Sequence, residues 1–487
     1  MKAYVLLGCA GLIMAPARAQ VVLKADSATA KEVRLSWTGA TGKEIRLERR
    51  AGPDRWDPVA TTTEANAADS KIAPFATYNY RVVSGALTSN VVTVGPPPGG
   101  FHTIVPKPAN HPDTALGKFI SPVLDANGDP AVAFVYADPN GDGRYDDTEI
   151  RFVSWDRAAY RWKEPVFVAT VGNWDPRPPV PGLAFARDAG SGTYGAAWVD
   201  PANKIVHLAL SKDGGATWSV KTLLSDPKPV AGPSLVFWGG QAHFTVASDG
   251  RNAILYLTGS LEDEPGAWKS STAPMAPGNT AVSRGSSLAL DDAGAPALAY
   301  WQRVNNGSLW TLYFWRPGGD APVKVTDTGT STYPPDGAIL TFAGKQPRIL
   351  LDSRLDRGQI SSHYSTFSND GGATWSKPVP VPDDGNEHIG GYMSFAVGPG
   401  GQAAFAGDVI GGNTQGMKCN WPKLARSADL TAWTTCAPEG AQAYPQVRTL
   451  WGTVLYAPSG MLYLVFQNRQ TGPQQGLPGG LLIWGGK

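Results

Sequence analysis

The chain has 487 residues and a mass of 51.4 kDa, with 42 Lys and Arg residues against 41 Asp and Glu residues. The resulting net charge of +1 provides no broad basic field, which argues against nucleic acid or an anionic membrane as the partner. The 57 glycines and 41 prolines favour many short strands joined by tight turns over a helical or disordered chain.

The first 19 residues have the features of a secretory signal peptide. Lys2 precedes an apolar run from Ala3 to Met14, and Ala17-Arg18-Ala19 supplies the small residues of a cleavage site. This run is too short to span a bilayer, and no later run is long enough. We therefore expect a secreted or periplasmic protein. Lipidation at Cys9, in a poor lipoprotein box, remains an alternative to free secretion.

Residues 21–94 predict a small domain of antiparallel strands. Apolar and polar residues alternate in Val33–Trp37, Glu44–Glu48 and Thr77–Val82, as expected of half-buried strands. The Trp on an early strand and the Pro-to-Tyr run before a late strand resemble the fibronectin type III family. The resemblance implies a β-sandwich in which the Tyr78 hydroxyl bonds back to the backbone. With no exposed aromatic row, we expect a spacer domain.

A Pro/Gly linker at residues 95–100 separates this domain from a second one over residues 101–487. The second domain repeats one hairpin, in which an apolar strand meets a Gly-containing turn and another apolar strand leaves. The turns recur about every 50 to 60 residues, the period of four-stranded propeller blades. They lie at Asp125–Gly128, Asp188–Gly190, Gly239–Gly240, Asp291–Gly294, Gly344–Lys345, Gly398–Gly400 and Ala457–Gly460.

The predicted fold is all-β, an N-terminal β-sandwich followed by a seven-bladed β-propeller, or six-bladed if one hairpin is miscounted. The last repeat supplies only three strands, Leu450–Tyr456, Met461–Gln467 and Gly480–Trp484. We expect Phe101–Val105 to provide the fourth, because pairing the two ends leaves no open edge.

A calcium loop is predicted over residues 138–149, which satisfy the pattern D-x-[DN]-x-[DN]-G-x5-E in full. Strands flank it, so it resembles the loop of an EF-hand and not the whole motif. The alternative is an acidic, solvated hairpin tip. The oxygen ligands would be Asp138, Asn140, Asp142, the carbonyl of Arg144, Asp146 and Glu149, holding calcium as a structural cofactor.

Two nearly identical octapeptides, Ser211–Trp218 and Ser368–Trp375, read as tight turns that close hairpins. They resemble the Asp-box of bacterial neuraminidase repeats and sialidase-like β-propellers. The resemblance implies that these turns lie on the outer edge and that ligands bind at the opposite face. Sialidases have six blades, and the Phe/Tyr-Arg-Ile-Pro segment that carries their first arginine is absent; Arg177-Pro178-Pro179 is a poor substitute.

Four arginines follow predicted second strands and would project into one funnel at the ligand-binding face of the propeller. There their guanidinium groups would bind carboxylate or sulfate in a bidentate manner. They resemble in type the sialidase arginine triad; solvated hairpin tips are the alternative. These substrate-binding candidates are Arg251, Arg303, Arg354 and Arg469.

The same face offers groups for acid and base chemistry. A retaining sialidase needs a Tyr nucleophile, a Glu that activates it and an Asp, for which Tyr333 or Tyr444, Glu387 and Asp352 are candidates. A lyase would use a base such as His388. Ordinary polar loop residues are the alternative for each.

The mature chain retains two cysteines, Cys419 and Cys436, which flank a predicted hairpin and are expected to form a disulfide in an oxidising compartment. Together the patterns predict an exported, sialidase-like propeller whose partner is an extracellular glycan or glycoprotein, with an anionic glycan as the expected substrate. As an enzyme it would be a glycosidase or a polysaccharide lyase. The alternative is a non-catalytic carbohydrate- or protein-binding adhesion propeller.

Overall fold

The computed structural model describes residues 20–486 except 43, 53–54, 108–115, 138–146, 173–181, 201–203, 227, 229, 306, 308, 328–336, 354–361, 382–387, 411–422, 436–437, 441–448 and 469–478. Side chains are also excluded at 117–118, 265, 284, 353, 362, 388–392, 408–410, 423 and 449–451. The predicted signal peptide therefore lies outside the described residues. The chain divides into two compact units, Met1–Pro96 with Arg157–Tyr160, and Pro97–Asp156 with Arg161–Lys487.

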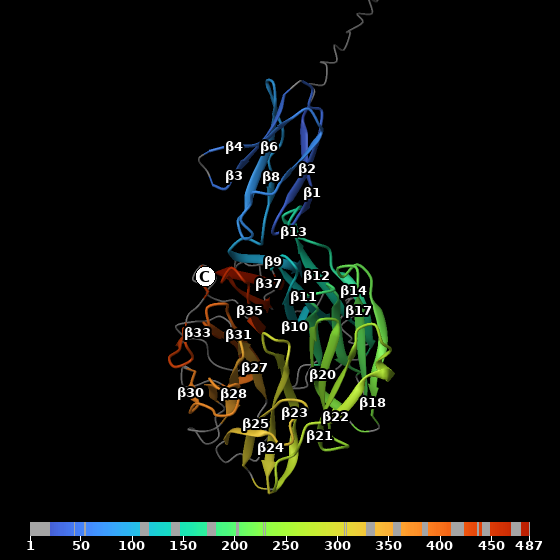
Figure 1. Cartoon of the computed structure of the whole chain (residues 1–487), viewed down its shortest axis with the longest axis vertical. Helices are drawn as coiled ribbons and strands as arrows, with labels where there is room; N and C mark the ends of the chain where they lie inside the picture. Colours follow the sequence, from blue (N-terminus) through green and yellow to red (C-terminus); the bar gives the residue numbers. More distant parts are fainter. Residues whose placement is uncertain are drawn as a thin grey trace, which may run out of the picture. The chain divides into compact units, whose positions relative to one another are not determined.

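The first unit contains two antiparallel sheets, with strand orders β1-β2-β5 and β4-β3-β6-β7, and β8 also pairs with β6 (Figure 1). One hydrophobic core contains side chains from both sheets, including Leu35 and Trp37 of β2 and Leu47 of β3. These residues are buried because alternate positions of a strand face the same side. The strands are β1 Val22–Ala28, β2 Val33–Thr38, β3 Ile45–Arg50, β4 Asp57–Thr62, β5 Asn66–Asp69, β6 Tyr78–Ser84, β7 Leu87–Thr88 and β8 Val92–Val94.

Two tyrosines of β6 tie this unit together through their hydroxyl groups. The Tyr78 hydroxyl accepts a hydrogen bond of 2.8 Å from the Ala73 N–H, which confirms the backbone bond expected for this residue. The Tyr80 hydroxyl donates to the buried Asp69, which also pairs with Arg49 at 2.7 Å. Burial, followed by the bond to Asp69, raises the pKa of Tyr80.

The described residues of the second unit form seven antiparallel sheets that follow one another along the chain. The first three are formed by β10 Leu116–Leu124, β11 Pro130–Tyr136, β12 Thr148–Asp156, β13 Arg161–Trp162 and β14 Val166–Gly172; by β15 Leu183–Arg187, β16 Tyr194–Val199, β17 Ile205–Ser211 and β18 Ser219–Ser225; and by β19 Val230–Trp238, β20 Gln241–Ser248, β21 Ala253–Ser260 and β22 Lys269–Thr272. A short 3-10 helix, Pro265–Ala267, precedes β22.

The remaining sheets repeat this plan. They are formed by β23 Asn279–Leu290, β24 Pro296–Val304, β25 Trp310–Trp315 and β26 Val323–Asp327; by β27 Ala338–Ala343, β28 Gln346–Ser353, β29 Ser362–Phe367 and β30 Val379–Pro380; by β31 His388–Val397, β32 Ala403–Ile410, β33 Lys423–Ser427 and β34 Thr434–Thr435; and by β35 Thr449–Tyr456, β36 Leu462–Asn468, β37 Gly480–Gly486 and β9 Gly100–Pro106.

The last sheet takes its outer strand from the beginning of the unit. β9 pairs antiparallel with β37, with Phe101 opposite Trp484 and Val105 opposite Leu481. The expectation that Phe101–Val105 completes the last repeat is therefore confirmed.

Among the residues that the structure describes, seven hydrophobic cores lie between neighbouring sheets of this unit. Six join consecutive sheets, and the remaining one joins the last sheet to the first through residues such as Val465 and Phe134. The innermost strands contact one another in the same order, from β10 through β15, β19, β23, β27 and β31 to β35, and β35 contacts β10. The packing order therefore returns to the sheet where it began.

The two Asp-box turns close the hairpins β17–β18 and β29–β30. In the first, Asp213 accepts hydrogen bonds from the N–H and the hydroxyl of Thr217, at 2.9 and 2.6 Å. The Ser211 hydroxyl donates to Asp213 and accepts from the Gly215 N–H. The second turn repeats these bonds around Asp370. These acidic side chains are thus engaged in holding the turn.

No helix among the described residues has the length and apolar character needed to cross a membrane.

Candidate functional site

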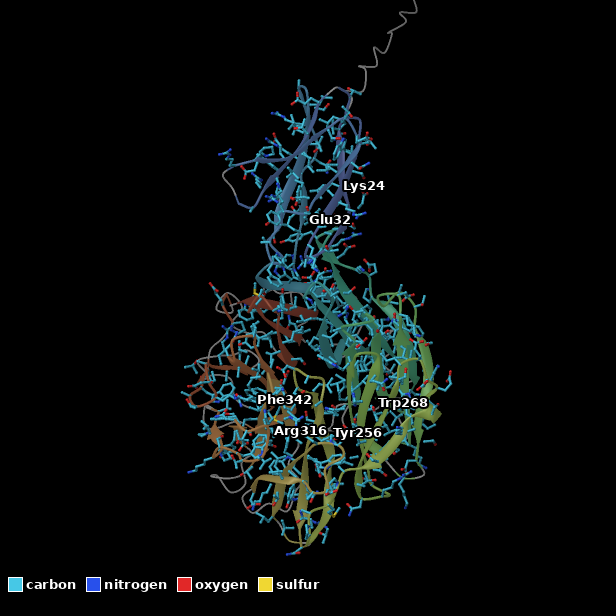
Figure 2. All side chains as sticks on the ribbon, viewed as in Figure 1. Lys24, Glu32, Tyr256, Trp268, Arg316 and Phe342 are labelled. Carbon is cyan, nitrogen blue, oxygen red and sulfur yellow. The ribbon has the colours of Figure 1, made fainter. Side chains whose placement is uncertain are left out.

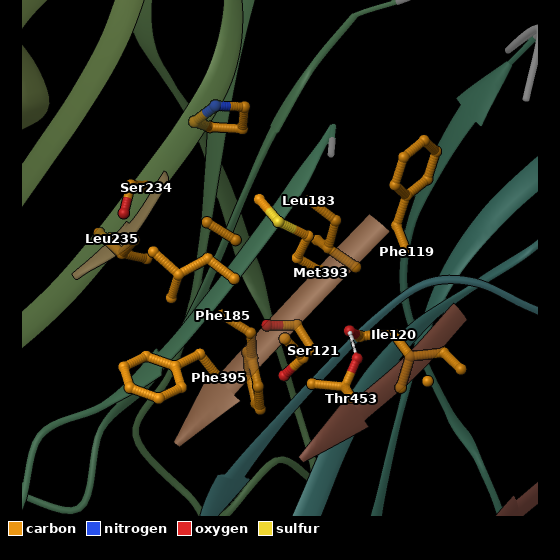
Figure 3. Close-up of a pocket in the computed structure, with 15 residues that line it drawn as sticks. Phe119, Ile120, Ser121, Leu183, Phe185, Ser234, Leu235, Met393, Phe395 and Thr453 are labelled. Atoms are coloured by element: carbon orange, nitrogen blue, oxygen red, sulfur yellow. Dashed lines mark hydrogen bonds between the residues drawn. The ribbon is translucent and has the colours of Figure 1, made fainter. Parts of the chain in front are cut away.

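A cavity of about 310 Å³ lies among the innermost strands of the second unit (Figure 3). Its wall is built by six of these strands, β10, β15, β19, β27, β31 and β35. Phe119, Phe185, Leu235, Met393 and Phe395 make much of the wall apolar. The volume is at the lower end of the range typical of small-molecule sites, roughly 300–1,000 Å³.

The hydroxyl groups on this wall join neighbouring sheets. The Ser234 hydroxyl accepts from the Leu288 N–H at 3.1 Å, and the Ser394 hydroxyl accepts from the Val454 N–H at 2.9 Å. The Thr453 hydroxyl donates to the Ile120 carbonyl at 3.1 Å. An innermost strand has one unpaired side, whose buried N–H and C=O groups require partners. These side chains supply such partners between sheets.

The innermost strands are also irregular beside the cavity. The pairing register with the second strand shifts at residues 118–121, 231–234, 282–286, 389–393 and 450–453. Phe119 has a positive φ of 51° and Gly232 one of 62°. Such bulges re-aim side chains and are common next to binding sites.

The antiparallel pairing fixes which residues share an end of each sheet. In the third sheet Val230, at the start of β19, lies opposite Ser248, at the end of β20, and the other sheets repeat this arrangement. Neighbouring sheets agree in direction, because the Asn252 side chain after β20 bonds Thr280 and Val282 at the start of β23. We call this end, with the strand starts of β19 and its equivalents, the funnel end.

Four predicted site residues lie at the funnel end. Arg251 follows β20, Asp352 is close to the end of β28, and the backbone of His388 begins β31 opposite Ile410. Arg303 lies inside β24 and not after it, a correction to its predicted position. The sequence pattern predicted that the strand ends before Arg303, whereas β24 continues one residue beyond it, to Val304.

Arg251 is held by an ion pair. Its Nε lies 3.1 Å from Oδ2 of Asp226, which comes from the connection between β18 and β19. Asp226 also accepts from the Ser248 hydroxyl and the Lys228 N–H. Burial opposes ionisation of Asp226, but these hydrogen bonds and the Arg251 charge outweigh it and lower the pKa. About half of the Arg251 side chain remains exposed, with a relative surface of 54%.

Next to Arg303, the buried Gln302 fixes the backbone that leads into β23. Its Oε1 accepts from the Ala276 N–H and the Asn279 amide, and its Nε2 donates to the Pro274 carbonyl. The half-buried Arg303 is opposite Ala281 on one side and Trp310 on the other. This well-bonded segment gives Arg303 a firm support at the funnel end.

Asp352 has a neighbour that sequence reasoning missed. It lies directly opposite His363 of β29, and both residues are buried, with 5% and 2% of their surface exposed. The His363 ring packs 4.8 Å from the ring of Phe405 in the next sheet. The sequence contains a signal for this pairing. One loop joins β28 to β29; Asp352 is the second-last residue of β28 and His363 is the second residue of β29, so the two positions are symmetric about the loop.

Most other predicted site residues lie outside the described residues. This holds for the side chain of His388 and for Tyr333, Tyr444, Glu387, Arg354, Arg469, Cys419, Cys436, Asp138, Asn140, Asp142, Arg144 and Asp146. The arginine clamp, the calcium loop and the disulfide therefore stay predictions.

Of the predicted calcium ligands, Glu149 alone falls on a described residue. Its Oε2 accepts from Arg151 at 2.7 Å, and Arg151 in turn lies over the Tyr136 ring at 4.7 Å. The ion pair therefore engages one of the two carboxylate oxygens of Glu149. No group of three or more His, Cys, Asp or Glu residues that could hold a metal is found within the described part of the chain.

No known protein-family model matches this chain, and no curated protein matches its sequence. Among solved structures it is similar to the Hadza microbial sialidase Hz136, at 12% identity over 96% of this chain and 92% of that one, with a TM-score of 0.43. It is also similar to the GH93 α-L-arabinofuranosidase of Fusarium graminearum in complex with arabinobiose, at 12% identity over 80% and 97%, with a TM-score of 0.44. For the NanB sialidase from Streptococcus pneumoniae the identity is 12% over 93% and 83%, with a TM-score of 0.39. Identities and TM-scores this low do not assign the chain to the family of any of these enzymes.

Proposed function

We propose that this chain is a secreted or periplasmic protein in which a seven-bladed, sialidase-like β-propeller acts on or binds extracellular anionic glycan. In this proposal the first unit is a fibronectin type III-like β-sandwich. The seven-bladed assignment is supported by the seven inter-sheet cores, whose order returns to the first sheet. The sandwich is supported by its shared core and by the Tyr78 hydroxyl bond.

The observation that carries the functional proposal is the meeting of site candidates at the funnel end. Arg251, Arg303, Asp352 and His388 are far apart in the sequence, yet each lies at this end of its own sheet. Arg354 and Arg469 directly follow β28 and β36 in the sequence. Ligand sites that several strands build together at one end of a sheet assembly are common in enzymes and binding proteins.

The proposed division of roles follows the chemistry of the side chains. The arginines bind the carboxylate or sulfate groups of the glycan, since a guanidinium presents paired donors to an oxyanion. Asp352 acts as acid or base, and His363 positions it. A glycosidase would add Tyr333 as nucleophile with Glu387 to activate it, whereas a lyase would use His388 as the base.

A non-catalytic carbohydrate- or protein-binding propeller is the second candidate. It is favoured by the ion pair between Arg251 and Asp226, which already satisfies one donor of a proposed clamp residue. It is favoured too by the absence from the sequence of the Phe/Tyr-Arg-Ile-Pro segment. Calcium at residues 138–149 and a Cys419–Cys436 disulfide would stabilise the unit in either case.

The direct test is to incubate the full chain with sialyllactose and, separately, with polyuronates. Release of free sialic acid identifies a glycosidase, and absorbance from unsaturated uronates identifies a lyase. Glycan binding without turnover identifies the second candidate. Neither binding nor turnover on any acidic glycan would refute the proposal.

Arg251→Gln and Arg316→Gln make a matched pair for this assay. Both arginines form an ion pair of 3.1 Å, to Asp226 and Asp291 respectively. Arg316 follows β25 at the opposite end of its sheet and lies over the Phe342 ring (Figure 2). We expect Arg251→Gln to weaken glycan binding and Arg316→Gln to leave it unchanged. Equal losses would mean that the ion pairs act only through stability.

A further inference from the structure

We propose that the first unit carries its own anion-binding surface, which fits the carboxylate or sulfate groups of an acidic polysaccharide. The surface is the outward face of β3 and β6 around Trp56, and its cationic members are Arg46, Arg50 and Arg81. We call it the Arg/Trp face. This inference does not depend on the function proposed for the second unit.

Strand alternation places these arginines together. Ile45 and Leu47 of β3 are buried in the core, so Arg46, Glu48 and Arg50 project outward. Tyr80 and Val82 of β6 are likewise buried, so Arg81 between them also projects outward. In the pairing register Arg81 lies opposite Glu48, which makes it a diagonal neighbour of both Arg46 and Arg50.

Trp56 holds two of the guanidinium groups. The guanidinium carbon of Arg50 lies 4.7 Å from the ring centroid, and that of Arg81 lies 4.3 Å from it. Trp56 comes from the segment before β4, on one side of β3, whereas Arg81 is on β6, on the other side. The ring therefore extends across the outward face of β3. Stacking occupies the flat faces of the guanidinium groups and leaves N–H donors at their edges.

The charges on this face are only partly balanced. Glu48 accepts from Arg81 at 2.7 Å and lies 3.9 Å from Arg46. Arg50 has no carboxylate partner within the described part of the chain, and its buried Nε lacks an acceptor. Among the described residues of this face, three arginines stand against one glutamate, an excess of two positive charges.

On the other sheet of the same unit, two basic side chains are paired with acidic ones, so the excess of positive charge is local to the Arg/Trp face. Lys24 pairs with Asp26 at 2.9 Å, and Arg34 pairs with Glu32 at 2.5 Å; Lys24 and Glu32 are labelled in Figure 2. Glu44 lies at the far end of β3 from Arg50, six residues or about 20 Å away at the usual rise of a strand. The free positive charge is thus concentrated beside Trp56.

The ligand class follows from the number and geometry of these donors. Two unneutralised guanidinium groups suit sparse carboxylates or sulfates, which they bind in a bidentate manner. Nucleic-acid binding needs many phosphates to be neutralised at once, about six to ten in typical specific complexes. An acidic polysaccharide, whose charges are spaced along the chain by sugar rings, matches the Arg/Trp face better.

The experiment measures binding of the full chain to polygalacturonate oligomers, with neutral dextran of similar length as the reference polymer. We expect Arg50→Gln to raise Kd roughly tenfold, because charge-assisted hydrogen bonds are lost, and Arg50→Lys to raise it less. Added salt should weaken the wild type more than Arg50→Gln. Arg34→Gln on the other sheet is the matched control and should leave Kd unchanged. Thermal unfolding verifies that each variant is folded.

The same titrations in an Arg251→Gln background separate this inference from the function proposed for the second unit. An effect of Arg50→Gln that persists in both backgrounds belongs to the Arg/Trp face. An equal loss in Arg34→Gln, no loss in Arg50→Gln, or tighter binding to dextran, duplex DNA or anionic vesicles would overturn the inference.

Discussion

Asp352 and His363 face each other across β28 and β29 in the interior of the second unit, near the funnel end. Residues directly opposite in an antiparallel pair project to the same side, with Cβ atoms about 4.5–5.5 Å apart. A carboxylate beside an imidazole is a combination that can move or hold a proton. The pair is therefore a candidate for acid–base chemistry.

If the protein is an enzyme, Asp352→Asn should lower kcat by roughly 10²- to 10⁴-fold, the usual contribution of a general acid or base. His363→Gln should shift the pH profile of kcat, because a positioning residue acts through the carboxylate. Both effects are measured on the acidic glycan that the wild type turns over, together with the melting temperature. An unchanged kcat in a folded Asp352→Asn protein would remove this residue from the reaction.

The repeated turns and their spacing were predictable because their signals are local. Asp213 and Thr217 lie four residues apart in one turn, so the octapeptide alone contains the bonding partners. The closing strand, Phe101–Val105, was predictable for a similar reason, since the last repeat lacked one strand.

The pairings at the funnel end were not predictable, because they join side chains from different strands or sheets. Asp226 meets Arg251, which lies 25 positions later in the sequence, and His363 meets Phe405 of another sheet. The predicted position of Arg303 is wrong because the strand is longer than its composition indicates. Pairing with the neighbouring strand decides where a strand ends, and local composition does not.

Gly215→Ala should destabilise the second unit because an added Cβ has no room. Gly215 has a φ of +91°, and a Cβ there would lie 2.0 Å from Cε1 of Phe152 in the preceding sheet. We expect a loss of about 3 kcal/mol, from left-handed strain of about 1–2 kcal/mol and overpacking of about 1–3 kcal/mol. Chemical unfolding followed by Trp fluorescence measures it.

Gly214→Ala is the matched control for this change. Its φ of +74° imposes the same kind of strain, but nothing lies within 4 Å of an added Cβ. The difference between the two variants isolates the contact with Phe152. Equal destabilisation would show that the turn does not pack on the preceding sheet.

The stabilising effect of Asp213 should depend on pH. Hydrogen bonds from the Thr217 side chain and N–H, and from Ser211, lower the pKa of Asp213 from 3.8 to about 2. A carboxyl whose pKa is lower in the folded state stabilises that state above its unfolded pKa. This contribution is lost as the pH falls through 3.8 towards about 2.

We therefore expect the melting temperature of the wild type to exceed that of Asp213→Asn near neutral pH, and the two to converge in strong acid. Melting curves from about pH 6 to about pH 2 measure the difference. Asp320→Asn, at an exposed aspartate outside the turns, is the control and should show no such convergence. A gap that stays constant with pH would contradict the role assigned to the ionised Asp213.

Calcium should stabilise the fold if residues 138–149 bind it. Saturating a site to about 100 times Kd contributes about 2.7 kcal/mol, which raises Tm by about 2–4 °C in a large domain. Calcium added after chelation should restore this increase in the wild type and not in Asp142→Asn. Glu164→Gln, at an exposed acid outside the loop, is the control. A wild-type Tm that does not respond to calcium would reject the site.

The hydroxyl groups beside the cavity should stabilise the fold because they form hydrogen bonds with backbone groups of the neighbouring sheet. Ser394 is buried, and its hydroxyl accepts from the Val454 N–H of the next sheet at 2.9 Å. Ser394→Ala leaves this buried N–H without its side-chain acceptor, so we expect a loss of about 1–3 kcal/mol. Ser260→Ala removes a hydroxyl that accepts from the Glu262 N–H within one exposed turn and should cost less than about 0.5 kcal/mol. Urea unfolding compares the stability of the two variants. Equal losses would show that the hydrogen bond between sheets contributes no more than a bond in an exposed turn. The apolar cores would then be the main interaction that holds neighbouring sheets together.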